Sequence, residues 1–196
     1  MDPAFGFLKG IISLILSLFL GTILCQNFMV RIQQYLASAG IILGLLLLQT
    51  TFLPFISIGG FLPDPLLLFL VIIALRRGQI EATVTGFIIG LLQDIIATKF
   101  FGLTALAKTI GGFIAGYFFN ENTMEQTLST YRYIFLTALV SVVHYGIYFL
   151  IFFQGVEGSV FASMMEMTLG MTLYTAVISV LPTFFYSRRY NISWVQ

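Results

Sequence analysis

Three ionisable residues interrupt an apolar segment of the chain that otherwise has the composition of membrane-spanning helices. Asp94, Lys99 and Lys108 lie within "GFIIGLLQDIIATKFFGLTALAKTIGGF". An ionised side chain at the bilayer centre costs roughly 2.5–3.5 kcal/mol on insertion scales, so such residues face the interior of a bundle or a partner. We expect Asp94 and Lys108 to pair beneath the outer surface, with Glu166 in the same polar cluster. The alternative is that each snorkels, or is satisfied by a neighbouring hydroxyl or backbone group.

His144 is the other residue of the apolar segments that could carry out chemistry. It lies near the middle of a predicted span, and we predict a neutral histidine hydrogen-bonded to another helix. A proton relay is disfavoured because no further titratable group is evident at its depth. Catalytic motifs such as GxxxxGK[ST] and HExxH are absent from the sequence, and one histidine with one cysteine excludes the usual structural zinc sites. The sequence therefore predicts no enzyme, no metal and no cofactor.

The composition of the chain is that of an integral membrane protein. Of its 196 residues, 59% are hydrophobic and only 9% are charged. Soluble domains carry about 25% charged residues. The net charge of +1 comes without a cluster of Lys and Arg, so we expect no nucleic-acid partner.

Apolar runs predict an all-α membrane domain of six helices over residues 29–196. A helix needs about 20 apolar residues to cross the hydrocarbon core. The predicted spans are residues 36–52, 65–75, 80–98, 102–119, 133–153 and 161–186. The longest polar stretch, residues 120–132, predicts a short surface helix. We expect it to start at Asn122, because Glu125 completes a capping-box pattern.

Residues 1–28 leave two alternatives open. Their apolar run, residues 5–25, is interrupted only by Lys9, and it predicts an extra N-terminal transmembrane helix. The other alternative is a misassigned start, with translation beginning at Met29. A secretory signal peptide fits poorly, because the charged start and the small-residue cleavage site are missing.

The positions of Lys and Arg predict the orientation in the membrane, since cytoplasmic loops are enriched in both. If Arg31 is cytoplasmic, the connectors alternate so that only Lys99 falls outside. We therefore expect a multi-pass protein of the cytoplasmic membrane with a cytoplasmic C-terminus. The residues placed inside are Arg31, Arg76, Arg77, Arg132, Arg188 and Arg189.

Three GxxxG patterns place pairs of glycines on one helix face, which lets helix backbones approach closely in lipid. We expect most of them to serve packing inside the bundle. The first pair, which lies beside Ala37 and Ser38, is the one we expect to face a partner's helix. The pairs are Gly40 and Gly44, Gly86 and Gly90, and Gly112 and Gly116.

The central part of the chain resembles the MreD family of rod shape-determining membrane proteins. "FLPDPLLLFLVIIALRRG" is followed by "GFIIGLLQD", then by "GLTAL" and a Gly-Tyr pair, in the order and spacing of that family. The resemblance extends over about residues 29–189, and its specific part is residues 45–117. The motif positions include Pro63, Asp64, Arg77, Gly78, Gly86, Gly90, Asp94 and Gly102.

The resemblance implies a non-enzymatic scaffold of the bacterial elongation complex. Such proteins bind the bitopic protein MreC in the membrane, and together they link MreB filaments to peptidoglycan synthases. The family's fold is similar to the six-helix substrate-binding subunits of energy-coupling-factor transporters. A vitamin-type substrate-binding subunit is therefore the alternative function, and the polar cluster would suit its ligand.

The chain also departs from the family pattern at three places. The segment 5–25 has no counterpart, Pro65 after Asp64 is unusual, and Lys108 replaces an apolar or small residue. We therefore treat the expected pair of Asp94 and Lys108 as a feature of this chain alone.

Overall fold

The computed structural model describes residues 29, 32–97, 101–153 and 160–193. Its described elements are helices, apart from an isolated bridge between Ile58 and Phe61. The predicted N-terminal helix, Lys99 and the outer loop 154–159 lie outside the described residues. The helices are Ile32–Thr51, η1 (Leu53–Ile56), α2 (Pro65–Arg77), α3 (Gln79–Ala97), α4 (Leu103–Tyr117), α5 (Met124–Leu128), α6 (Tyr131–Phe152), α7 (Val160–Ile178) and α8 (Val180–Ser193).

The chain divides between Leu43 and Gly44 into two compact units, and the larger unit, Gly44–Gln196, contains η1 and all the helices from α2 to α8. The boundary falls inside the helix Ile32–Thr51. The predicted single domain over residues 29–196 and the extra helix before it stay predictions.

Four of the described helices are long and apolar enough to cross a membrane: Ile32–Thr51, α3, α6, and α7 with α8 as Phe161–Arg188. The prediction of an all-α membrane protein is confirmed. Helices α2 and α4 also form where spans were predicted, but they have only 13 and 15 residues. At about 1.5 Å per residue they reach roughly 20 Å, less than the hydrocarbon core of about 30 Å.

Helix α2 is short because both of its ends are fixed by special residues. Pro65 occupies the first helical position, where its missing N–H costs no hydrogen bond. Gly78 ends the helix with φ at 86°, a conformation that favours glycine. Most of α2 is buried, including Leu66, Leu70 and Val71. A short helix with irregular flanking backbone is tolerated at membrane depth when protein rather than lipid surrounds it.

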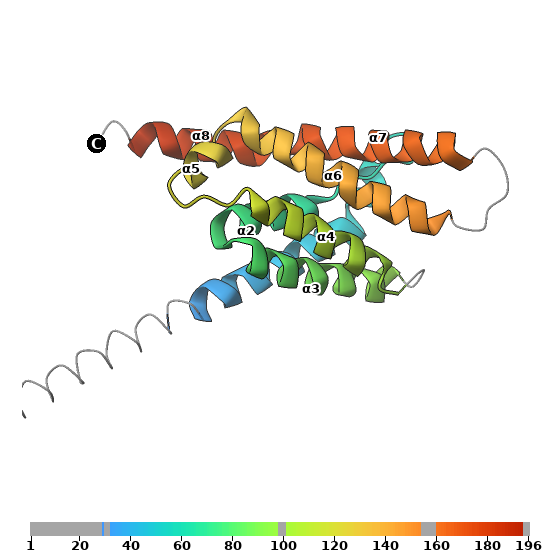
Figure 1. The fold of residues 1–196 in the computed structure, drawn as a ribbon, viewed down its shortest axis with the longest axis horizontal. Coiled ribbons are helices and arrows are strands. Elements are labelled where there is room, and N and C mark those ends of the chain that lie inside the picture. The colour runs from blue at the N-terminus through green and yellow to red at the C-terminus, as the bar shows by residue number, and fades with distance from the viewer. Residues whose placement is uncertain (1–28, 30–31, 98–100, 154–159, 194–196) are drawn as a thin grey trace, which may run out of the picture. The chain divides into compact units, whose positions relative to one another are not determined.

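Helices α3 and α4 form the closest pair of the bundle and lie side by side in Figure 1. A Cβ added to Gly90 would lie 2.4 Å from the Cα of Ala105, and one added to Gly116 would lie 2.3 Å from the Cα of Gln79. Gly86 and Gly112 are equally close to backbone of the opposite helix. All four glycines therefore lie where the backbones of α3 and α4 approach closely.

Helices α6, α7 and α8 complete the bundle, with α7 and α8 following each other along one side in Figure 1. The buried hydroxyl of Tyr133 on α6 donates to the carbonyl of Leu68 on α2, at 3.0 Å. The break between α7 and α8 falls at Ser179, because Pro182 in the next turn has no N–H to continue the helical ladder.

The surface helix α5 begins later than predicted. It covers Met124–Leu128 with Thr123 at its N-cap, and no side chain caps it. The prediction of a capping box starting at Asn122 was wrong. The side chain of Asn120 accepts the N–H of Asn122 at 3.1 Å, which forms a local turn before the helix.

Candidate functional site

The carboxylate of Asp64 occupies the centre of the bundle, where it contacts two helices through its two oxygens. It is the N-cap of α2, and its Oδ1 accepts the N–H of Leu67 at 3.0 Å. Its Oδ2 accepts a charge-assisted hydrogen bond from the ammonium group of Lys108 on α4. Asp64 is 4% exposed and Lys108 is fully buried, so each neutralises the other's charge away from water.

Two further helices reach the same carboxyl residue. The Nε2 of His144 on α6 lies 3.8 Å from Oδ2 of Asp64. The backbone N–H of Asp64 donates to the hydroxyl of Thr175 on α7, at 3.3 Å. The hydroxyl of Tyr145 lies 3.4 Å from the same Thr175 oxygen. One residue thereby connects α2, α4, α6 and α7.

Asp94 is used differently from what the sequence predicted. Its carboxylate lies near the end of α3 and accepts the N–H groups of Gly102, Thr104 and Ala105, at 2.9, 3.3 and 3.1 Å. Those groups belong to the first turn of α4, whose own N-cap is a glycine without a side chain. Asp94 therefore caps α4 from the preceding helix.

The prediction that Asp94 pairs directly with Lys108 was wrong. Lys108 pairs with Asp64, and the carboxylate of Asp94 accepts hydrogen bonds from three backbone N–H groups. The physical reason is that a carboxylate beside an uncapped helix start is satisfied by the orphan N–H groups there. Asp94 thus follows the alternative reading, in which a backbone group satisfies the charge.

Glu166 also differs from its prediction, whereas the neutral His144 hydrogen-bonded to another helix stays a prediction. Glu166 is exposed on α7, so it takes no part in the buried Asp64–Lys108 pair. His144 is 3% exposed and lies beside that pair, although the sequence showed no titratable group at its depth. The sequence missed Asp64 as a partner because it precedes a helix 44 residues before Lys108, and no local spacing links the two.

A cavity of about 460 Å³ lies beside this polar centre. Asp64, His144 and Tyr145 form its polar wall, and the rings of Phe149, Phe152 and Phe153 line its apolar side. Its remaining lining residues are Gln49, Leu62, Pro63, Gln93, Ala97, Thr104, Tyr148, Met167 and Met171. Such a mixture of aromatic walls and a few polar groups is typical of small-molecule pockets.

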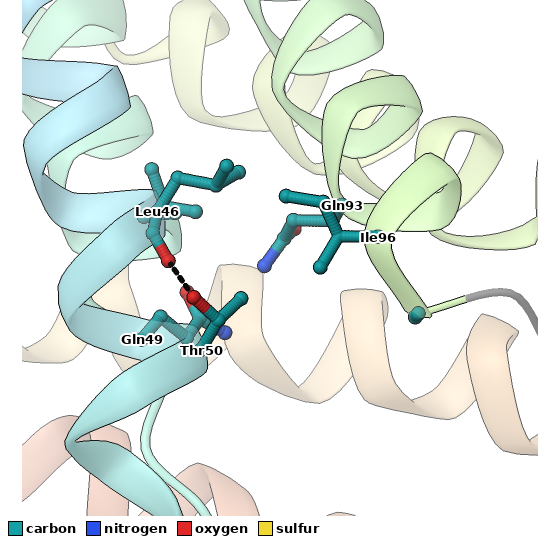
Figure 2. A pocket seen from close by; sticks show the side chains of 7 residues that line it. Leu46, Gln49, Thr50, Gln93 and Ile96 are labelled. Carbon is teal, nitrogen blue, oxygen red and sulfur yellow. Dashed lines mark hydrogen bonds between the residues drawn. The ribbon is translucent and has the colours of Figure 1, made fainter.

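A smaller cavity of about 160 Å³ shares Gln49 and Gln93 with the first one. Figure 2 shows Gln93 of α3 extending toward the turn that carries Gln49 and Thr50, and the hydroxyl of Thr50 donating to the carbonyl of Leu46. Within the part of the chain that the structure describes, the Oε1 atoms of Gln49 and Gln93 are buried without a hydrogen-bond partner. These atoms need a water or a ligand as partner.

Among the described residues, no group of three or more His, Cys, Asp or Glu side chains is arranged to hold a metal ion. In this site the carboxylate of Asp64 pairs with Lys108, and the imidazole of His144 lies beside that carboxylate.

The model of one protein family, described as rod shape-determining protein MreD, matches residues 29–189. The chain belongs to the MreD family. MreD is a family of shape-determining membrane proteins and not a known enzyme family. No curated protein matches the chain, and no solved structure does so either.

The positions that carried the resemblance to MreD have structural roles in this chain. Asp64 caps α2 and pairs with Lys108, and Asp94 caps α4. Gly78 and Gly102 take positive φ, at 86° and 92°. Arg77 lies in the last turn of α2, 3.8 Å from Glu81. The MreD motif of this chain thus fixes helix ends and helix contacts.

Proposed function

We propose that this protein is a non-enzymatic membrane scaffold of the bacterial elongation complex. In this role it binds MreC in the membrane and helps couple MreB filaments to the peptidoglycan synthases that shape the cell. The match to the MreD family over residues 29–189 carries the proposal. The protein is a multi-pass membrane protein, and we place it in the inner membrane with its C-terminus in the cytoplasm.

The distribution of arginines supports this orientation. Arg76 at the end of α2 donates to the hydroxyl of Tyr186 in the middle of α8, at 2.9 Å, so the end of α2 lies beside the middle of α8. Arg77 lies at the same end of α2 and Arg188 half a turn beyond Tyr186, and Arg132 opens α6, which packs on α5 and α8. A bundle end rich in Arg faces the cytoplasm under the positive-inside rule.

The glycine pairs indicate where MreC would bind. The contact between α3 and α4 buries four of these glycines, namely Gly86, Gly90, Gly112 and Gly116. A Cβ added to Gly40 or Gly44 meets no atom of the described residues within 4 Å. Such a pair can still receive a second helix at close range. Several large apolar side chains of the same helix are exposed, among them Leu43, Leu47 and Leu48.

The test is co-purification of MreC with the full chain and with a Gly40→Leu/Gly44→Leu variant from the native host. Leucine fits the open space at both positions, so the variant should fold normally and lose MreC. Gly146→Leu is the matched control, because Gly146 on α6 also has open space around its Cα. Retention of MreC by the double variant would place the interface elsewhere, and absence of MreC from the unaltered protein would reject the scaffold function.

The cavity beside Asp64 supports a second candidate, a substrate-binding subunit of a vitamin-type transporter. Its volume of about 460 Å³, and the Oε1 atoms of Gln49 and Gln93 that have no partner among the described residues, suit a small polar molecule with an apolar body. The similarity to six-helix transporter subunits stays a prediction. Native mass spectrometry of the purified protein separates the candidates: a stoichiometric small molecule or an ATP-driven module supports the transporter, whereas MreC without a ligand supports the scaffold.

A further inference from the structure

A hollow distinct from the Asp64 cavity lies between the end of α4, the α5 segment and the first half of α6. Its volume is about 410 Å³. It lies at the end of α4 opposite to the turn that Asp94 caps, and so on the arginine-rich side of the bundle. The lining residues are Phe118, Asn120, Thr123, Thr127, Tyr131, Arg132, Phe135, Leu136 and Leu139.

One end of this hollow is rich in hydrogen-bond donors. Arg132 is exposed and forms none of the ion pairs found among the described residues. Asn120 uses its oxygen to accept the N–H of Asn122, so its amide NH₂ remains a donor. The hydroxyl of Thr123 adds a third group.

Among the described residues no carboxylate lines the hollow, although Glu121 and Glu125 lie in the same segment. Thr123 at the N-cap of α5 and Thr127 within it both line the hollow, whereas Glu125 between them is not among its lining residues. Both glutamates are exposed. The lining of the donor end therefore carries a positive charge without a compensating negative one.

The other end of the hollow is apolar and continues along α6 into the membrane. Tyr131, Phe135 and Leu139 are spaced four residues apart, so they form one stripe on the helix. They are 73%, 71% and 37% exposed. In the proposed orientation, Tyr131 and Phe118 lie at the cytoplasmic end of the bundle, and aromatic rings are common where a membrane meets water.

We propose that this hollow is a binding site for an anionic phospholipid. The phosphate group accepts hydrogen bonds from Arg132, Asn120 and Thr123, and an acyl chain lies along Phe135 and Leu139. The positive charge at one end selects an anionic headgroup over a zwitterionic one, because basic residues attract anionic lipids at the membrane surface. A free phosphate would leave the apolar end of the hollow uncovered. This site is independent of whether the protein binds MreC or a small ligand.

The test is native mass spectrometry of the full chain in detergent, titrated with phosphatidylglycerol and, separately, with phosphatidylethanolamine. We expect the unaltered protein to retain phosphatidylglycerol preferentially. Arg132→Gln should weaken that retention by about five-fold, the contribution expected of one basic residue near an anionic headgroup. Arg188→Gln is the matched control, since Arg188 is also exposed, near the end of α8, and stacks on the ring of Phe184 at 4.5 Å instead of lining the hollow.

A second variant tests the acyl chain separately from the phosphate. Leu139→Trp fills the apolar end without changing any charge, and it should also reduce phosphatidylglycerol retention. Leu173→Trp, at an exposed position of α7, is its control and should have no effect. Equal retention by the protein and Arg132→Gln would overturn the proposal. So would equal binding of the two lipids, or displacement of the lipid by inorganic phosphate alone together with no effect of Leu139→Trp.

Discussion

The ammonium of Lys108 and the carboxylate of Asp64 form a buried ion pair, although 44 residues separate them in the sequence. The pair connects the start of α2 to α4, and both of its side chains are buried. Its position beside His144 and Thr175 makes it the point where four helices meet.

Removing one partner of this pair should be far more damaging than removing both. Lys108→Met or Asp64→Asn alone leaves a buried charge without its partner, which costs about 3–5 kcal/mol. The double variant Asp64→Asn/Lys108→Met leaves no charge, and its amide can still cap α2. We expect the double variant to be more stable than Lys108→Met alone, measured by thermal unfolding in detergent. A double variant whose loss equals the sum of the single losses would refute this coupling.

Asp94→Ala should destabilise the start of α4. Three N–H groups of that turn lose their acceptor, and loss of a helix cap costs roughly 0.5–2 kcal/mol. Asp94→Asn should have a smaller effect, because its amide oxygen can still accept. Hydrogen exchange at Gly102, Thr104 and Ala105 is the direct measurement. Glu166→Gln is the control, since Glu166 is exposed; unchanged exchange in Asp94→Ala would count against the capping role.

The closely packed glycines should tolerate no added methyl group. Gly90→Ala and Gly116→Ala each place a Cβ within 2.4 Å of backbone on the facing helix, so α3 and α4 must separate. We expect a lower Tm for both variants. Gly44→Ala, in open space, should keep or raise the Tm, because alanine is favoured over glycine in helices by about 1 kcal/mol. Similar Tm values for all three variants would contradict the packing described for α3 and α4.

The buried hydroxyls of α7 should respond differently to valine. Thr172 is 5% exposed and its hydroxyl has no hydrogen-bond partner among the described residues. Thr172→Val should therefore be neutral or stabilising. Thr175 accepts the N–H of Asp64, so Thr175→Val leaves a buried donor unsatisfied and should cost about 1–3 kcal/mol. Denaturant unfolding of the two variants in the same detergent measures the difference, and the reverse order would contradict these hydrogen bonds.

The sequence predicted the parts of this structure that depend on local pattern. Apolar runs located the helices, and the spacing of Gly86, Gly90, Gly112 and Gly116 identified the helix faces that touch. Alternation of Arg-rich and Arg-poor connectors predicted an orientation in the membrane, and that orientation stays a prediction.

The partners of the buried charges could not be predicted in the same way. Asp94 and Lys108 lie on neighbouring helices at similar depth, which favoured a pair between them. The choice depended on two facts invisible in the sequence: the first turn of α4 has no side-chain cap of its own, and the start of α2 lies against the middle of α4. Tertiary arrangement, rather than spacing along the chain, selects Asp64 as the partner of Lys108.

The shortness of α2 and α4 has a consequence for how the protein enters the membrane during synthesis. Each has fewer residues than a stable span requires. Asp64 at the start of α2 and Lys108 within α4 neutralise each other's charge. Asp64 leaves the ribosome 44 residues before Lys108. The carboxylate at the start of α2 therefore has no ammonium partner until α4 has been synthesised. We therefore expect α2, α3 and α4 to insert together, so that α2 of a chain arrested between α3 and α4 can still be extracted from the bilayer.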